Sequence, residues 1–411
     1  MTLPDDLDRR VAGAALGLAA FLFPLLTLVA PLGVAPLGTV LGVACLPLVI
    51  RRRLWRGLPW PLVAGLSALA GWALLSALWA VDPAQAARGA LRFLLVSGLG
   101  CCGLAVLPAL DEAARTRAAQ ALLAGLAAAA ALFLVLLQVE PSGSHGIDTT
   151  KRGVTILALL IWPARRLVSP LLPRGGIVAA TLAVCGVVLA GSSFSAKVAT
   201  MIGLAVVVAV ALQPRRTVGV LAGLAIVVVL ALPWLAERIP SPHYTFQSWD
   251  FLPYSSHHRS TIWGFVGARI VEHPWLGWGM DSSRAIPGGE VEILVQRFAP
   301  DGRVVMELTE PWLPLHPHNA ALQVWLELGG VGVLIVLALL CWVLFRVAQA
   351  PRAERGDRAA LVFSTFAVAC VSFGLWQSWW QASFWMLALM AALDPLRPGA
   401  VLPSATKETP R

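Results

Sequence analysis

Charged residues are scarce in this sequence of 411 residues. They make up 13% of it, whereas hydrophobic residues make up 58%. This balance excludes an ordinary soluble core, because apolar runs of roughly 17 to 25 residues recur from one end of the chain to the other. Runs of this length match the hydrocarbon thickness of a bilayer. The composition therefore predicts an all-α polytopic membrane protein.

Cysteines and clustered carboxylates are also scarce. All six cysteines fall inside the apolar runs, which excludes an external disulfide framework, and their spacing matches no zinc site. The expected outer loops contain no Asp-x-Asp pair or other carboxylate cluster that would hold Mg²⁺. We therefore expect neither a metal nor another cofactor. The cysteines are Cys45, Cys101, Cys102, Cys185, Cys341 and Cys370.

Twelve apolar runs are the expected spans, and one long segment interrupts them. Residues 1–236 hold nine runs, residues 237–315 form the interruption, and residues 316–411 hold three more runs and a tail. The first run lacks an Ala-x-Ala cleavage pattern, so we interpret it as a retained span. The runs lie at about 11–31, 34–50, 59–80, 90–110, 118–138, 153–164, 169–190, 198–213, 217–236, 318–347, 359–377 and 379–394.

Basic residues orient these spans. With the N-terminus in the cytoplasm, the inside segments hold 20 of the 31 Lys and Arg residues, as the positive-inside rule favours. Both termini are then cytoplasmic, and segment 237–315 is external. Topology and anionic lipid account for the net charge of +9, so this charge does not indicate a nucleic-acid partner.

Segment 237–315 concentrates aromatic side chains. They argue against disorder and suit a cap at the level of the lipid headgroups. Ser255 and Ser256 can start a helix that runs to about Glu272, just before His273-Pro274. All seven histidines of the chain fall on the outer side or at its boundary, namely His145, His243, His257, His258, His273, His316 and His318.

The expected helix carries a charge on its apolar face. Ile262, Trp263, Val266 and Ile270 form one stripe, and Arg259 lies in the middle of it. A guanidinium in this place either reaches a lipid headgroup or faces a pocket that holds a phosphate. The sequence leaves both interpretations open.

A His-Pro-His-Asn motif precedes the run at 318–347. Pro317 is suited to the first turn of a helix, so we expect His318 and Asn319 at the mouth of a span and His316 at the cap position. An imidazole held at the water boundary indicates chemistry on a molecule that lies at that boundary.

Four motifs together resemble those of the O-antigen ligase and polymerase superfamily. They are Arg259-Ser-Thr-Ile-Trp, His273-Pro-Trp-Leu-Gly-Trp-Gly, His316-Pro-His-Asn and Glu327-Leu-Gly-Gly-Val-Gly. The Gly191-Ser-Ser-Phe-Ser-Ala-Lys197 turn is similar to that family's Ser-Arg-Gly element, with lysine in place of the more usual arginine. The resemblance is specific over about 190–335 and only topological elsewhere.

The resemblance implies a C-type membrane glycosyltransferase of the bacterial inner membrane. It implies one large periplasmic loop, a donor glycan on undecaprenyl diphosphate, and no metal. Ligases of this family pass the finished polymer to a sugar of the lipid A core, whereas polymerases pass it to another lipid-linked repeat unit.

Such a reaction needs cations. The leaving diphosphate gains negative charge in the transition state, and without a metal the protein must stabilise that charge. Arg259 and Lys197 are the first candidates, and Arg88 and Arg92, behind Asp82-Pro83, form a further pair. Lys197 has a competing role as a headgroup anchor at the end of a span.

His318 is the candidate general base. In the first turn of a helix, the positive end of the helix dipole would lower the pKa of its imidazole below roughly 6.5 and keep it neutral. The competing interpretation is a satisfied interfacial histidine. His316 is a further candidate contact to the substrate, and Asn319 either orients a sugar hydroxyl or caps the helix.

Glu327 is an acidic residue inside an apolar run. By helical rise it lies some 13 Å into the bilayer, where an unpaired carboxylate costs roughly 2 to 3 kcal/mol. Either a structural polar contact or a part in substrate binding and catalysis explains it. Gly329, Gly330 and Gly332 beside it predict close helix packing.

Two alternatives to a ligase stay open. A polymerase of the same superfamily shares the motifs, and the single compact cap favours the ligase only by analogy. A transporter of lipid-linked glycan would need paired polar residues or broken helices near the midplane. Apart from Glu327, the expected spans are nearly free of charge.

Overall fold

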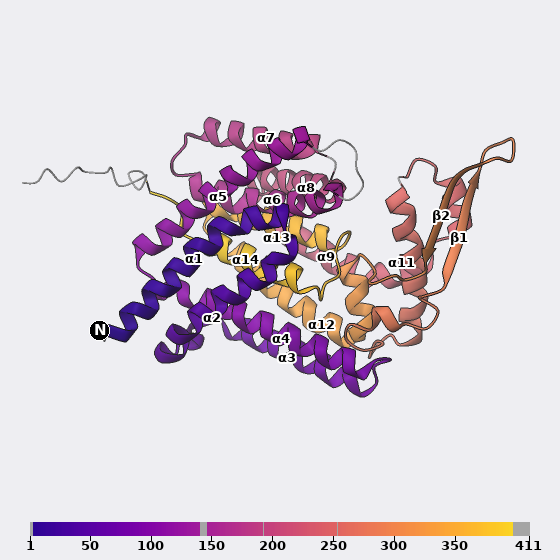
Figure 1. Ribbon diagram of the computed structural model, residues 1–411, viewed down its shortest axis with the longest axis horizontal. Coiled ribbons are helices and arrows are strands. Elements are labelled where there is room, and N and C mark those ends of the chain that lie inside the picture. The colour runs from indigo at the N-terminus through magenta and orange to yellow at the C-terminus, as the bar shows by residue number, and fades with distance from the viewer. Residues whose placement is uncertain (1–2, 140–145, 192, 253, 398–411) are drawn as a thin grey trace, which may run out of the picture.

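The computed structural model describes residues 3–139, 146–191, 193–252 and 254–397, and most of them are helical (Figure 1). His145 and Ser192 lie outside the described residues. The helices are α1 (Leu3–Val29), α2 (Val34–Arg52), α3 (Trp60–Leu75), α4 (Pro83–Val106), α5 (Glu112–Val139), α6 (Gly146–Val168), α7 (Arg174–Ala190), α8 (Phe194–Leu212), α9 (Pro214–Glu237), α10 (Pro242–Ser248), α11 (Tyr254–Glu272), α12 (Ala320–Ala348), α13 (Arg352–Ala369) and α14 (Ser378–Ala392). A short 3-10 turn, η5 (Ser282–Ala285), and two strands, β1 (Glu292–Phe298) and β2 (Val304–Pro311), lie between α11 and α12.

Eight helices of the described part are long and apolar enough to cross a membrane. They are α1 to α5, α8, α9 and α12. The chain is thus an all-α membrane protein in its bundle, but the expected number of twelve spans is not confirmed. The other four expected spans do form helices, which are α6, α7, α13 and α14. Among these, α7 has 17 residues and α14 has 15, and α13 carries charge along its first half.

The buried side chains of the bundle form two large apolar clusters. One joins α1, α2, α5, α6, α8, α13 and α14. The other joins α3, α4, α9 and α12 to α11, which belongs to the long segment between α9 and α12. Ile262, Val266 and Ile270 of α11 are buried in this second cluster, as the apolar stripe predicts. The segment before α12 is therefore packed on the bundle through α11.

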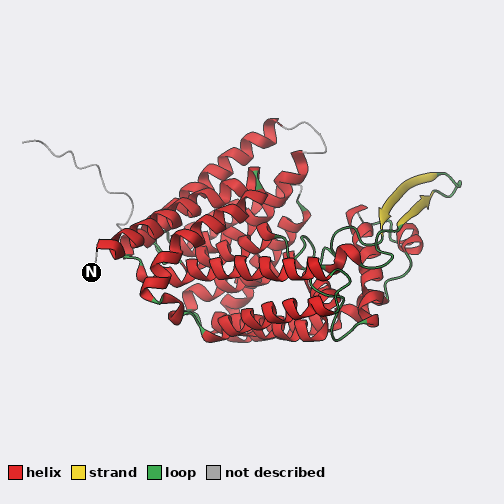
Figure 2. Ribbon diagram, turned by 60° about the horizontal axis from the view of Figure 1, so that its bottom comes forward, coloured by secondary structure: helices red, strands yellow, loops and turns green. Residues whose placement is uncertain are grey.

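The two strands form an antiparallel hairpin that extends away from the helices (Figure 2). Val295 and Leu308 on its inner face are buried against Phe246 of α10. Gly302 in the connection has a φ of +83°, which suits glycine. The sequence predicted no strand here, although the pair Asp301-Gly302 between apolar residues is a hairpin signal.

Helix α12 is broken at Gly329, where φ is +63° and ψ is −168°. The segment after α11 fills the break, because Trp278 N donates to Leu326 O at 2.8 Å and Gly330 N donates to Pro274 O at 2.8 Å. A Cβ at position 329 would lie 2.3 Å from Trp275 O. The glycines at this point therefore admit a loop into the helix, whereas we had expected them to pack a neighbouring helix.

Candidate active site at the start of helix α12

Asn319 is the cap of α12. Its side-chain Oδ1 accepts a hydrogen bond from Leu322 N at 3.1 Å, and the residue is buried. The helix itself begins at Ala320, so the expectation that Pro317 opens the first turn and that His316 caps the helix is wrong. Asn319 takes the cap position instead of His316, because its side chain accepts a hydrogen bond from a free backbone N–H of the first turn. Asn319 thus caps the helix, which is one of the two roles predicted for it.

His318 lies just before the cap in a left-handed backbone conformation, with a φ of +54°. A non-glycine residue rarely adopts this conformation, and it turns the imidazole away from the helix axis. Nδ1 of His318 lies 2.6 Å from Ser372 O. Because a carbonyl oxygen can only accept, Nδ1 carries the proton, and Nε2 is left with a free lone pair.

Three imidazoles meet at this point. The ring centroids of His316 and His318 lie 4.2 Å apart, and that of His258, on α11, lies 6.1 Å from His318. Nδ1 of His316 accepts a hydrogen bond from His318 N at 3.2 Å. The cluster thus combines residues from α11 and from the segment that enters α12.

Burial controls the protonation of this cluster. Burial is the largest of the causes that lower the pKa of His318 from 6.5 to about 4; the hydrogen bond to Ser372 O opposes it, and Arg259 and His258 add smaller decreases. Burial likewise lowers the pKa of His316 to about 3, with smaller contributions from His318 and Arg284. The expected direction for His318 is thus found, but burial is its main cause and the helix dipole is not, since His318 precedes the helix.

Arg259 stands beside the cluster on α11. Its Nη1 donates to Ser255 O at 3.1 Å, and no acidic residue of the described chain pairs with it. One turn further along α11, Trp263 Nε1 donates to Pro317 O at 2.9 Å and fastens the helix to the His-Pro-His segment. Arg259 therefore shares a helix face with this contact and is near enough to His318 to influence its charge.

Lys197 is not brought into this cluster. It lies in the first turn of α8, where Ser195 Oγ accepts from Ser372 Oγ at 2.6 Å. Residues two positions apart on a helix lie about 200° apart around its axis, so Lys197 is turned away from the side that Ser195 presents. By helical periodicity it shares a face of α8 with the exposed residues Met201 and Val208. Among the described residues it forms no hydrogen bond or ion pair.

Arg88 and Arg92 lie on α4, near the turn η5. Arg92 forms an ion pair with Asp281 at 2.7 Å, and Gln85 Nε2 donates to the same oxygen at 2.6 Å. Arg88 Nη2 donates to Gln85 Oε1 at 3.2 Å and is otherwise exposed. The two arginines are therefore tied to Asp281, and no contact between them and His318 is found in the described part of the chain.

Glu327 is completely buried, with an exposed fraction of 0%. Its Oε2 accepts from Asp281 N at 2.7 Å and from Trp376 Nε1 at 2.5 Å. Its Oε1 accepts from Gln323 Nε2 at 3.1 Å and from the Ser283 hydroxyl. Four donors thus satisfy both oxygens, which supports the structural interpretation of this carboxylate.

Three residues of the site escaped the sequence reasoning. Arg284 lies on η5, is exposed, and has no hydrogen-bonding or acidic partner among the described residues. His258 and Ser372 contact His318 directly. Two of them had a usable signal: His258 is one of the outer-side histidines and directly precedes Arg259, and Arg284 follows the His273–Gly279 motif by five positions. Ser372 lies between two apolar helices, and nothing in the sequence connects it with position 318.

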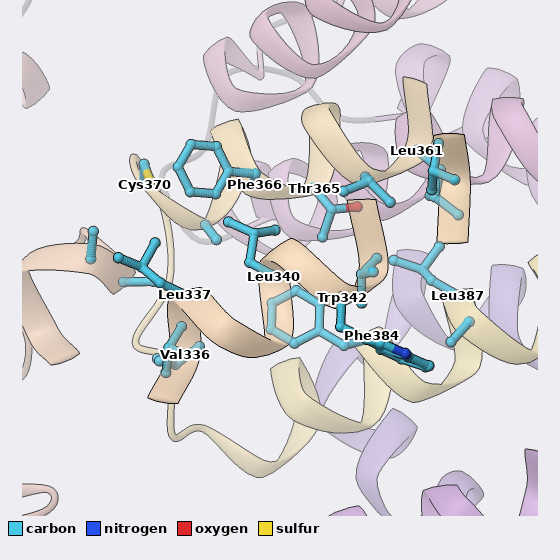
Figure 3. Close-up of a pocket in the computed structure, with 18 of the residues that line it drawn as sticks. Val336, Leu337, Leu340, Trp342, Leu361, Thr365, Phe366, Cys370, Phe384 and Leu387 are labelled. Carbon is cyan, nitrogen blue, oxygen red and sulfur yellow. The ribbon is translucent and has the colours of Figure 1, made fainter. Parts of the chain in front are cut away.

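An apolar cavity of about 620 Å³ lies between α12, α13 and α14. Figure 3 shows Leu337 and Leu340 of α12, Phe366 of α13 and Phe384 of α14 around it. Its lining begins with Ala320 and Ala321, directly after the cap residue, and extends along α12 to Arg346. The cavity thus connects the neighbourhood of the histidine cluster with the interior of the bundle.

Comparison with known proteins agrees with the motifs. A sequence model of the family described as O-antigen ligase matches residues 176–337, from α7 into α12. A protein of Rickettsia conorii named polysaccharide ligase is 35% identical over 155 residues, which are 36% of this chain and 34% of that protein. A polysaccharide ligase of Rickettsia felis is 25% identical over 332 residues, which are 78% of each chain. The chain is thus similar to the O-antigen ligase family over residues 176–337 and, along most of its length, to a polysaccharide ligase.

The match to this superfamily covers most of the candidate site. Arg259, Arg284, His316, His318 and Glu327 all lie within residues 176–337. A similarly named protein of Rickettsia typhi is 32% identical over 166 residues, which are 40% of this chain and 38% of that protein. The chain thus spans only about a third of the length of the first relatives it matches, those of R. conorii and R. typhi. The long apolar helices make it a membrane protein, and the proteins to which it is similar are named polysaccharide ligases.

Proposed function

We propose that this protein is a ligase-type glycosyltransferase of the bacterial inner membrane. It moves a glycan from undecaprenyl diphosphate to a sugar hydroxyl of the lipid A core at the periplasmic face, without a metal. The observation that carries this proposal is His318, whose Nε2 is free while its Nδ1 is fixed by Ser372 O. An imidazole in this state beside an unpaired arginine is suited to remove a proton from an acceptor next to a bound anion.

The reaction forms one bond and breaks another. The acceptor oxygen bonds to the anomeric carbon of the donor, and the bond from that carbon to the diphosphate oxygen breaks. The proton of the acceptor hydroxyl goes to Nε2 of His318, and the electron pair goes to the leaving diphosphate. Arg259, which has no acidic partner among the described residues, stabilises the charge that develops there.

The bound donor also changes His318. A diphosphate near the ring adds negative charge, which favours the imidazolium and raises a pKa that burial has lowered to about 4. The base therefore becomes stronger when the donor is present. We assign Lys197 the competing role of a headgroup anchor, because it lies towards the exposed apolar side of α8.

The apolar cavity between α12, α13 and α14 suits the polyisoprenyl chain of the donor. A lipid carrier with a diphosphate head needs an apolar channel that begins beside the anion site. Ala320 and Ala321 line the start of this cavity, directly after the His-Pro-His-Asn motif. The diphosphate would then lie at the histidine cluster while the chain lies along α12.

Transport is the second candidate, because the break in α12 is a feature that transporters use. In this structure the break is closed by protein, since residues 274–279 bond to both of its sides and Glu327 has its donors within the chain. Reconstituted protein that moves a lipid-linked oligosaccharide across vesicles without an acceptor would favour transport over transfer.

A deletion in the native host tests the proposal. We expect core lipid without long chains, together with accumulated lipid-linked polymer, on gels of surface glycan. Core lipid that carries a single repeat unit would mean that the protein is a polymerase, and an unchanged pattern would contradict both activities.

A further inference from the structure

Glu327 connects two loops that border the candidate site. Each of its oxygens accepts two hydrogen bonds, and the donors come from different parts of the chain. One pair of donors, Asp281 N and the Ser283 hydroxyl, belongs to the turn η5 and its start. Trp376 Nε1 belongs to the loop between α13 and α14. A buried carboxylate with this many donors fixes the loops relative to α12.

The turn η5 carries Arg284 towards the histidine cluster. Arg284 lies next to Ser283, which Glu327 holds, and its charge reaches His316. The turn is also held from α4, through the ion pair of Arg92 with Asp281. Since Arg284 has no acidic partner in the described part of the chain, its guanidinium is available for an anion.

The loop between α13 and α14 holds the imidazole of His318. Trp376 donates to Glu327, and Leu375 N donates to Gln323 Oε1 at 2.8 Å. Three positions before Leu375, Ser372 O lies 2.6 Å from Nδ1 of His318. A Cβ at Gly374 would lie 2.7 Å from Cδ2 of His316, so this loop packs directly on the cluster.

We propose that Arg284 contacts a phosphate group of a substrate and that Glu327 is the positioning residue that sets Arg284 and His318 at a fixed separation. This inference rests on the function proposed above. The phosphate belongs either to the diphosphate of the donor or to the phosphorylated core of the acceptor. In both cases the anion lies between η5 and the histidine cluster.

Glu327 bonds the turn η5 on one side and the loop between α13 and α14 on the other, and variants of these two sets of contacts have different expected effects. Arg284→Ala and Ser283→Ala act on η5, so the KM of the substrate that carries the phosphate should rise roughly tenfold to a hundredfold for Arg284→Ala and less for Ser283→Ala. Trp376→Phe acts on the other loop and should lower kcat and shift the pH profile, because Ser372 no longer holds the His318 ring. A merely structural role would lower the amount of folded protein and leave KM and the pH profile unchanged.

Glu327→Gln tests both sets of contacts together. The amide nitrogen of glutamine cannot accept the two hydrogen bonds that one carboxylate oxygen accepts, so we expect a loss of kcat/KM of about a hundredfold. Glu307→Gln is the matched control, since Glu307 lies on the exposed hairpin and its side chain bonds, among the described residues, only Gln296. If Glu327→Gln does not fold, Arg284→Ala at the exposed position decides the question.

The probe is farnesyl diphosphate, whose binding to the whole detergent-solubilised protein is measured by calorimetry. Weaker binding to Arg284→Ala than to wild type places the phosphate on the donor. Unchanged binding with a raised KM for purified lipid A-core places it on the acceptor. Unchanged values for both would overturn the inference. Wild-type protein that binds the probe through Arg284 but transfers no glycan would contradict the proposed function alone.

Discussion

His318 is held in one tautomer by its surroundings. Ser372 O accepts from Nδ1, so only Nε2 can take a proton, and the cap at Asn319 leaves His318 outside the helix. The orientation of this one ring therefore decides which of its nitrogens can accept a proton. Arg259 is the nearest cation on α11, and Trp263 fixes its helix through Pro317.

We predict that Arg259→Ala raises the KM for the donor and lowers kcat together. In the proposed function the guanidinium contacts the diphosphate before and during its departure, and loss of one such group typically costs on the order of a hundredfold to a thousandfold in rate. Steady-state kinetics with a lipid-linked donor measure both constants. Arg238→Ala, which removes an exposed arginine at the end of α9, is the control. Unchanged kinetics would return Arg259 to a contact with lipid headgroups.

The lowered pKa of His318 predicts the pH dependence of the free enzyme. The neutral imidazole is the active form, so kcat/KM should stay level as the pH falls from 8 to 5 and should fall near pH 4, the pKa of His318 in this structure. The measurement is kcat/KM across this range in a constant-ionic-strength buffer. An acid limb near 6.5 instead would show that the ring is solvated and that burial does not control it.

The break in α12 is the element that joins the outer segment to the bundle. Residues 274–279 bond to the turn around Gly329, and Gly277 and Gly329 each adopt a positive φ, at +71° and +63°. Their backbones approach too closely for side chains. This explains why both motifs, although about fifty positions apart, contain glycine at the points where they meet.

We predict that Gly329→Ala destabilises the protein. A side chain in this backbone conformation costs about 1 to 3 kcal/mol, and the new Cβ would also collide with Trp275 O. Gly71→Ala on α3 is the matched control, because nothing lies within 4 Å of a Cβ there. Thermal unfolding of the purified protein measures both variants, and equal melting temperatures would contradict the inserted loop.

Local sequence patterns predicted where the helices lie, but they did not predict which segments contact one another. The stripe of Ile262, Val266 and Ile270 gave α11, since helical periodicity is a local property. The approach of the 274–279 segment to Gly329 depends on residues some fifty positions apart, and no pattern within either motif specifies the partner. For the same reason Ser372 and Arg284 could not be joined to His318 from the sequence. The cap role of Asn319 was one of its two predicted roles, but Pro317 suggested a helix start before Ala320, where the helix begins.

At the scale of the whole molecule, both large apolar clusters meet at α12, and the hairpin lies away from the bundle beyond α11 (Figures 1 and 2). If segment 237–315 is periplasmic, as basic residues predict, then the connection between α12 and α13 is cytoplasmic. The orientation of the protein can therefore be tested at two points.

We predict that alkaline phosphatase inserted at Gly302 is active and that the same enzyme fused after Ala350 is inactive. The reporter needs disulfides that form only in an oxidising compartment such as the periplasm. Activity of colonies that express each fusion at equal levels is the measurement. The reverse pattern would place the histidine cluster in the cytoplasm and exclude the proposed acceptor.

We also predict that the purified protein transfers glycan in excess EDTA. The expected outer loops lack a carboxylate cluster, and Arg259 and Arg284 are the cations that would stabilise the departing diphosphate. Product formation with and without EDTA, at saturating donor, is the measurement. A strict requirement for Mg²⁺ or Mn²⁺ would remove this mechanism.

The insertion of residues 274–279 into α12 has a consequence for how a substrate arrives. Residues 274–279 are hydrogen-bonded on both sides of Gly329, and Trp263 is hydrogen-bonded to Pro317. The outer segment is therefore attached to the bundle at several points, which does not favour a rigid-body opening about one hinge. If the donor is lipid-linked, as proposed, its route of entry is lateral, from the surrounding leaflet and between helices, with its water-soluble end at the membrane surface.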